Sequence, residues 1–362
     1  MGSNPTPGIT EDVHRDVGMD AFAEAERLVD EFGPRPAGSD SERRAAQHLC
    51  RRLEEIGREA HVEGFSVWPA WATAYAINCG IAIVGSVLAV SSAKLGTGLV
   101  LLATILTFLD LAGIAATTRR LLGRRASQNV VSWGDLDMPG ALFLVAHYDS
   151  GPLRDRPLRP MFYAMLVLLA CCVLRAAGME GTALTLVQFI PTVALIVYVA
   201  LLLDIALSPA APGENDNASG VAVVLGLAAR LHELGYFGVH VLFTGSQKAM
   251  TQGMRAFLQA HRKRLKPSDT VVLNLDAVGG GELRETKSEG PLLTVRSHPQ
   301  LTGNLEGAGF VNREASDGYA AASAGLPSVT LSGSENRLDE DRLTEAENVC
   351  AELVERLEEE LS

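Results

Sequence analysis

Four side chains that can bind a metal ion follow apolar runs of the sequence. They are His147 and Asp149 after ALFLVA, Asp216 in GENDNASGVA and Asp276 in LNLDAVG. One imidazole and several carboxylates at a common point would suit zinc, which accepts nitrogen and carboxylate oxygen ligands. The same groups could instead form a metal-free cluster in which the aspartates pair with neighbouring cations. Both interpretations are open at this point.

Strand-like runs separated by helical patterns would position these side chains. ALFLVAHYDS, GVHVLFTGS and TVVLNLDAVGG are short apolar runs that end in polar or glycine-rich residues, and helical patterns such as SGVAVVLGLAARLHEL lie between them. This alternation predicts an α/β fold with a mixed, mostly parallel sheet covered by helices on both faces. Ligands of such sheets gather beyond the carboxyl ends of the strands, which is where the four side chains would lie.

The polar N-terminal part of the chain predicts two helices. A long amphipathic helix precedes a GPRPAGS turn, and a second helix is expected from about Ser41 to Ile56, with Ser39 or Asp40 as its cap. Residues 1–18 are polar and acidic, and they lack the apolar core of a cleaved secretory signal. We expect them to form a disordered tail.

Four apolar runs stand apart from this pattern. Hydrophobic residues make up 47% of the chain and charged residues still reach 20%, so the apolar excess must be concentrated. A bilayer span needs about 20 apolar residues, and the runs lie at about 72–92, 95–118, 160–174 and 181–203. We therefore expect two transmembrane hairpins, 67–118 and 160–207, in the lipid bilayer. The α/β fold would then be assembled from residues 19–66, 119–158 and 209–362.

Acidic side chains occur near the ends of two of these runs, at Asp110 and Asp204. A carboxylate in this position could belong to an ion relay, or it could simply lie at the membrane interface. The interfacial interpretation is the commoner one for carboxylates at span ends.

The basic residues predict an orientation for the spans. Seven arginines flank the spans on the side of the polar segments: Arg119, Arg120, Arg124, Arg125, Arg154, Arg156 and Arg159. The two tight turns on the other side hold only Lys94 and Arg175, which predicts an α/β fold facing the cytoplasm. The five cysteines have no disulfide-framework or zinc-knuckle spacing, which fits a reducing compartment. The net charge of −12 excludes a nucleic-acid binder.

Five motifs together resemble a known family: GPRPAGSDSERRAAQHLCRRLEEIG, AHYDS, DNASGVA, NLDAVG and ASDGYAAASAGLPSV. The sequence is similar to the di-zinc aminopeptidases, metallopeptidase family twenty-eight, whose relatives include glutamate carboxypeptidases and glutaminyl cyclases. The resemblance implies a zinc aminopeptidase-like fold in which His147, Asp216 and Asp276 bind one zinc and Asp149 orients the imidazole. It also implies a cis peptide bond between Asp216 and Asn217.

The departures from the family pattern are concentrated. The family's paired glutamates, a general base and a ligand of the other zinc, precede a G-[SA]-x-x-F pattern that matches Gly253–Phe257. Gln247 and Lys248 stand in their places, and no Asp or Glu occurs from Leu234 to Ser268. The family's last zinc-binding histidine is replaced by one of two neighbours, Asn336 or Arg337. Gly318 follows the SD motif, where relatives often have histidine.

Both missing ligands belong to the same zinc, so the resemblance implies at most one zinc ion. Lys248, with Arg337, would place positive charge where the second ion belongs, or would pair with the aspartates in a metal-free cluster. The leading hypothesis is a membrane-anchored, catalytically degenerate peptidase-like domain that binds a peptide or a partner protein. One alternative is a single-zinc aminopeptidase-type hydrolase that uses another base. The other is the regulatory domain of a membrane transporter or assembly factor.

Overall fold

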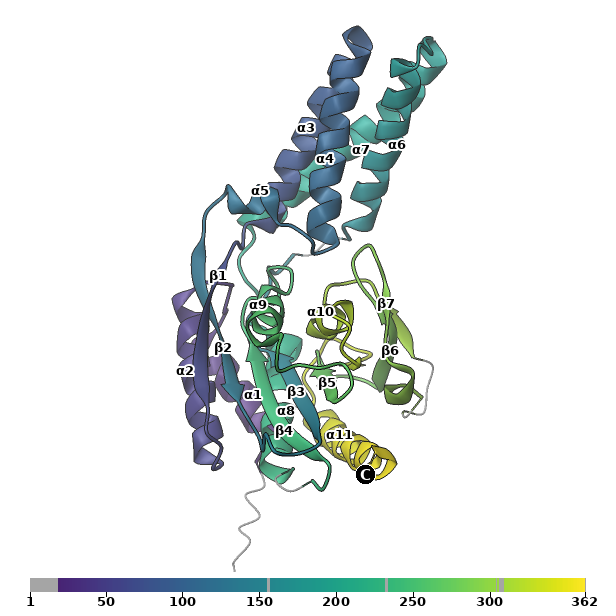
Figure 1. Cartoon of the computed structure of the whole chain (residues 1–362). Coiled ribbons are helices and arrows are strands. Elements are labelled where there is room, and N and C mark those ends of the chain that lie inside the picture. Colours follow the sequence, from purple (N-terminus) through teal and green to yellow (C-terminus); the bar gives the residue numbers. More distant parts are fainter. Residues whose placement is uncertain (1–18, 155–156, 232–233, 304, 306–308, 362) are drawn as a thin grey trace, which may run out of the picture.

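The computed structural model describes residues 19–361, except 155–156, 232–233, 304 and 306–308. The expected tail at residues 1–18 lies outside the described residues. Figure 1 shows long helices that project from one end of an α/β body, and among the described residues the apolar helices long enough to cross a membrane number four. We call these four helices the helix bundle.

A nine-stranded mixed sheet forms the centre of the α/β body. Its strands are β1 (His61–Val67), β2 (Arg125–Ser132), β3 (Gly140–His147), β4 (Phe237–Thr244), β5 (Thr270–Leu275), β6 (Leu283–Glu289), β7 (Val295–Arg296), β8 (Phe310–Asn312) and β9 (Ser328–Gly333). The order is β1-β2-β4-β3-β5-β9-β6-β7, and β8 pairs with β6. The central strands β4, β3, β5 and β9 run parallel, whereas β1, β2, β6 and β7 join antiparallel. The predicted fold class is confirmed.

Helices cover both faces of the sheet, because the central strands are apolar on both faces. One face packs against α1 (Ala21–Phe32), α2 (Asp40–Glu55), α8 (Gly220–Arg230) and α11 (Glu340–Leu361), and the other against α9 (Gln252–His261) and α10 (Asp317–Ser323). Alternate β3 residues serve the two faces: Leu144 lies in the first core and Val145 in the second. The Ser39 hydroxyl accepts a hydrogen bond from the backbone N–H of Glu42 at 3.1 Å, so Ser39 is the cap of α2.

The helix bundle consists of α3 (Trp71–Ser91), α4 (Ala93–Leu111), α6 (Arg159–Ala176) and α7 (Thr182–Leu207). By length and composition, all four are long and apolar enough to cross a membrane. They pack around a core of their own that includes Tyr75, Val100 and Met165. On the outer surface, large apolar side chains remain exposed, such as Val87 at 64% and Ile190 at 69%. An apolar surface of this kind suits a lipid environment better than water.

In the second apolar run, 95–118, the helix is shorter than the composition predicts. Helix α4 ends at Leu111 because the chain turns at Gly113, whose φ of 70° is left-handed. A short helix, α5 (Thr117–Arg120), follows. Its Arg119 donates to Asp110 with an Nε–Oδ1 distance of 3.0 Å, and both side chains are buried.

The carboxyl edge of the sheet faces the helix bundle. Strand β3 leads to α6, and the loop after β4 contacts the bundle core through Met250 (Figure 1). Arg154, in the segment after β3, forms an ion pair with Asp204 near the end of α7. Both acidic side chains near the span ends therefore have arginine partners, as interfacial carboxylates would.

Candidate metal centre

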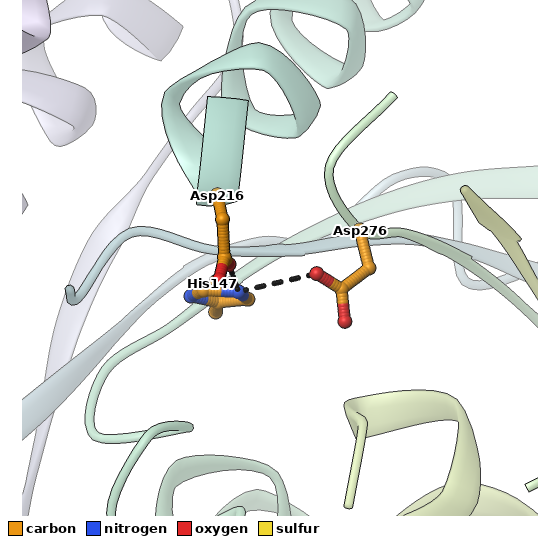
Figure 2. A group of neighbouring side chains, drawn as sticks. All are labelled: His147, Asp216 and Asp276. Carbon is orange, nitrogen blue, oxygen red and sulfur yellow. Dashed lines mark ion pairs between the residues drawn. The ribbon is translucent and has the colours of Figure 1, made fainter. Parts of the chain in front are cut away.

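Three of the predicted ligands meet at the carboxyl edge of the sheet. His147 closes β3, Asp276 follows β5, and Asp216 lies in the segment η1 (Glu214–Ser219) before α8, where its own backbone angles are non-helical. Figure 2 shows their side chains pointing toward one another, and one ligand atom of each lies within 4.8 Å of the others. His147 Nε2 is 3.1 Å from Asp216 Oδ1 and 3.5 Å from Asp276 Oδ1. The expected cis peptide bond between Asp216 and Asn217 is present.

Asp149 connects the imidazole to the loop after β4. The backbone oxygen of Asp149 lies 3.1 Å from His147 Nδ1, and its carboxylate Oδ1 lies 3.4 Å from the same nitrogen. The carboxylate also accepts hydrogen bonds from the backbone N–H groups of Gln247 and Lys248, each at 2.9 Å. Asp149 therefore fixes both the ring of His147 and the backbone of Gln247 and Lys248.

Lys248 is the direct neighbour of a candidate ligand. Its Nζ lies 2.7 Å from Asp216 Oδ2, and the two side chains are 19% and 38% exposed. The depth of the site opposes ionisation of Asp216, but the Lys248 ammonium and His147 outweigh it and hold the pKa of Asp216 below its ordinary value. Burial likewise opposes the charge on Lys248, and Asp216 and Asp276 nevertheless raise the pKa of Lys248. Both groups are charged at neutral pH.

Gln247 and Arg337 have partners other than the three ligands. The Gln247 amide Nε2 donates to the backbone oxygen of Ala315 at 2.8 Å. The Arg337 guanidinium pairs with Glu335 at 3.1 Å and with Asp339 at 3.6 Å, and its side chain is 59% exposed. We expected Arg337 to balance the negative charge of Asp216. It pairs instead with Glu335 and Asp339, because the turn that carries Arg337 provides these carboxylates.

Arg35 was missed as a site residue, although it lies in the GPRPAGS motif. Its side chain is fully buried and donates to the backbone oxygens of Tyr148, at 2.7 Å, and of Gly213, at 3.2 Å. Burial lowers the pKa of Arg35 to about 10, while Asp149 and Asp216 act in the opposite direction. Arg35 therefore ties the segment after β3 to the segment that precedes Asp216.

Asp317, in the ASDGY motif, was also missed. Its carboxyl is buried and accepts a hydrogen bond from the Thr244 hydroxyl. Burial raises the pKa of Asp317 to about 7, partly offset by His147 and Thr244. The next residue, Gly318, has no room for a side chain, because a Cβ there would lie 2.2 Å from Thr330 Oγ1. A histidine at position 318 is therefore incompatible with this packing.

A cavity of about 720 Å³ adjoins the candidate metal centre. The site contributes Asp216, Gln247 and Lys248 to its wall, together with Asn336 and Arg337 from the turn before α11. A second part of the lining, which we call the apolar wall, includes Trp71, Leu153, Leu158, Met250 and Pro291, from the base of the helix bundle and the loops beside it. The sequence did not indicate this second wall, because its members come from four separate segments.

The comparisons agree with the fold. The family model described as Peptidase family M28 matches residues 130–339, which is more than half of the chain. This protein belongs to Peptidase family M28. No curated protein sequence matches the chain.

Solved structures of the same fold include enzymes of two kinds. A zinc aminopeptidase from Bacillus subtilis has a TM-score of 0.55 at 13% identity, over 93% of this chain and 94% of that one. A Zn-dependent exopeptidase from Parabacteroides distasonis has a TM-score of 0.54 at 13% identity, over 92% and 96%. Glutaminyl cyclase from Bacteroides thetaiotaomicron has a TM-score of 0.52 at 11% identity, over 92% and 96%. At such identities the likeness establishes the fold alone.

Proposed function

We propose that this chain is a membrane-inserted, catalytically degenerate member of family M28 whose site binds a peptide or a partner protein. The observation that carries the proposal is the ion pair between Lys248 Nζ and Asp216 Oδ2, at 2.7 Å. Lys248 stands where the resemblance places a ligand of the second zinc. An ammonium beside Asp216 balances the charge that the second ion would balance, and it repels a dication at that point.

The remaining ligand set fits one zinc ion. His147 Nε2 and Asp216 Oδ1 are buried 3.1 Å apart, and neither makes a hydrogen bond of good geometry with any described residue, while Asp276 Oδ1 lies 3.5 Å from His147 Nε2. Three protein ligands with an open position form the arrangement that zinc adopts in catalytic sites. A zinc held there would supply Lewis-acid polarisation of a carbonyl oxygen. Asp149 would keep the His147 ring oriented, and the metal-free charge cluster is the competing state.

A general base is missing at the expected place. Gln247 carries an amide, which cannot take a proton from water, and its Nε2 is engaged with Ala315. A positioned general base or acid contributes roughly 10²–10⁴-fold to a rate. Asp317 is a buried carboxyl of raised pKa, but it does not line the cavity. These features support a binding site in which a peptide is held without efficient hydrolysis.

Membrane insertion and orientation belong to the same proposal. The apolar outer surface of the bundle supports insertion of all four helices, with the boundaries given by the sequence. The arginines at the base of the bundle support an α/β body in the cytoplasm. A single-zinc hydrolase is the alternative that the intact ligand set favours.

Metal content and turnover of the purified full chain test the proposal. We expect at most one zinc per chain and no appreciable release of amino acids from aminopeptidase substrates. Lys248→Glu should raise the metal content if the position is a vacated ligand site, and Gln247→Glu with Lys248→Glu should restore turnover if the loop is otherwise intact. Two zinc ions in the unaltered protein, or robust turnover abolished by Asp276→Ala, would return the chain to the active enzymes.

A further inference from the structure

The cavity beside the metal centre has two chemically different walls. One wall carries the polar groups of Asp216, Gln247 and Lys248. The other is apolar and includes Leu153, which is 64% exposed, with Trp71, Leu158 and Met250. These last three side chains also pack on the core of the helix bundle. The cavity therefore lies at the junction of the α/β body and the bundle.

The lengths of the helices fix the distance of this junction from a membrane. Helices α3, α4 and α6 have 21, 19 and 18 residues, which correspond to about 27–32 Å, and α7 has 26 residues, or about 39 Å. The hydrocarbon core of a bilayer is about 30 Å thick. Trp71 is the first residue of α3 and Leu158 immediately precedes α6, so inserted helices would leave no stalk between the bilayer and the cavity. The apolar wall would then stand at the membrane surface.

We propose, as an extension of the binding function above, that the cavity takes a polypeptide segment that continues directly from a membrane span of another protein. Such a segment begins with the apolar residues of a span end and goes on into polar chain. The first part matches the wall of Trp71, Leu153 and Leu158, and the second matches the wall of Asp216 and Gln247. The volume of about 720 Å³ is typical of sites that enclose a ligand.

The polar part of the lining carries groups of both charges. Gln247 Oε1 is buried and has no hydrogen-bond partner among the described residues, Asp216, Glu214 and Glu314 add carboxylates, and Arg313 and Arg337 add guanidinium groups. The Lys248 ammonium is already paired with Asp216. Peptide N–H and C=O groups can pair with both the acidic and the basic side chains of this lining, whereas the phosphodiester anion of a phospholipid can pair only with the basic ones. The wall therefore suits a polypeptide better than a phospholipid headgroup.

Tethered peptides in nanodiscs that contain the full chain test this inference. Each peptide has an apolar helix of about 20 residues, a Gly/Ser spacer, and the same fluorescent probe sequence with a free amino terminus. Spacers of about 2, 8 and 25 residues vary the distance between the probe and the membrane. We expect the shortest spacer to bind at least about tenfold tighter than the longest, because effective concentration falls once the linker exceeds the span. The probe sequence without helix or spacer reports soluble binding.

Two matched leucine variants locate the binding surface. Leu153→Ser removes an exposed apolar side chain from the cavity wall and should weaken short-spacer binding about fivefold. Leu136→Ser removes a similarly exposed leucine, 55% exposed, outside the cavity lining, and should leave binding unchanged. Zinc content should not differ between the two variants.

The possible outcomes separate this inference from the proposed function. Affinity that is independent of spacer length, or that grows with it, while the soluble probe still binds, overturns the membrane-side inference alone. Displacement of the probe by a rising fraction of phosphatidylglycerol assigns the cavity to a lipid headgroup and overturns it as well. Failure of every probe to bind, tethered or soluble, removes both proposals.

Discussion

At the scale of single residues, Lys248 decides how the site treats a metal ion. Its ammonium lies 2.7 Å from an oxygen of Asp216, the residue that a zinc ion would share with His147 and Asp276. Like charges at this separation repel strongly where water is partly excluded. The side chain therefore balances the acidic centre without a metal and competes with one.

Replacing Lys248 should strengthen zinc binding. Lys248→Met keeps the length of the side chain and removes its charge, so we expect zinc affinity to rise at least about tenfold, or about 1.4 kcal/mol. Chelator competition on the purified chain measures it. Lys248→Arg is the control, because it retains the positive charge and should show no such gain. Equal affinities in Lys248→Met and the unaltered protein would contradict the competition.

The close packing around Gly318 leads to a prediction about the stability of the fold. Gly318→Ala would place a Cβ 2.2 Å from Thr330 Oγ1 in a buried position, so we expect a loss of about 1–3 kcal/mol in the free energy of unfolding. Gly64→Ala, in β1, meets nothing within 4 Å and should stay within about 0.5 kcal/mol. Thermal unfolding in detergent compares the two. Equal melting temperatures would show that the Thr330 side chain moves away from the new methyl group at little cost in free energy.

At the scale of elements, the base of the bundle is attached to the site by a buried ion pair. Arg119, in α5, pairs with Asp110 of α4, and its Nη1 donates to the backbone oxygen of Ala249 at 2.9 Å. Ala249 directly follows Lys248. A second pair, Arg154 with Asp204, joins the segment after β3 to α7 but is largely exposed.

The two pairs should differ strongly in their contribution to stability. Arg119→Met leaves Asp110 buried without its partner, and we expect a loss of about 3–5 kcal/mol. Arg154→Met breaks an exposed pair and should cost about 0–1 kcal/mol. Thermal unfolding of both variants in the same detergent gives the comparison. A larger loss for Arg154→Met would mean that burial does not govern these contacts.

The elements that the sequence predicted are those with strong local signals. The central strands that end at His147 and Asp276 are continuous apolar runs, and α2 has a capping serine. Edge strand β1 was not predicted, since its mixed polar composition carries little pattern. The sequence also did not predict the partners of Asp317 and Arg337. They depend on Thr244, which lies 73 residues from Asp317, and on the turn that holds Glu335 and Asp339.

At the scale of the whole molecule, the two helical hairpins enter the α/β body at the same end (Figure 1). Because each hairpin crosses twice, the body must lie on one side of the membrane in the proposed arrangement. We propose that this side is the cytoplasm, which the arginine distribution supports.

Cysteine labelling tests this orientation. In a cysteine-free background, Ser92→Cys and Ala177→Cys lie exposed at the far ends of the hairpins and should react with an impermeant maleimide added outside intact cells. Ser268→Cys, exposed on the α/β body, should react only after the cells are opened. The reverse pattern would place the body outside.

The contacts of Arg35 also determine when this protein can finish folding during its synthesis. Arg35 donates to the backbone oxygen of Pro212, 177 residues later, and β1 pairs with β2 across the first hairpin. At ordinary rates of translation, roughly 10–30 s separate the two ends of the Arg35 contact. In the membrane-inserted chain, both hairpins leave the ribosome within that interval. Closure of the α/β body therefore comes after both hairpins have been delivered to the bilayer. A chain in which one hairpin has not been inserted would expose an open sheet edge to the quality-control machinery.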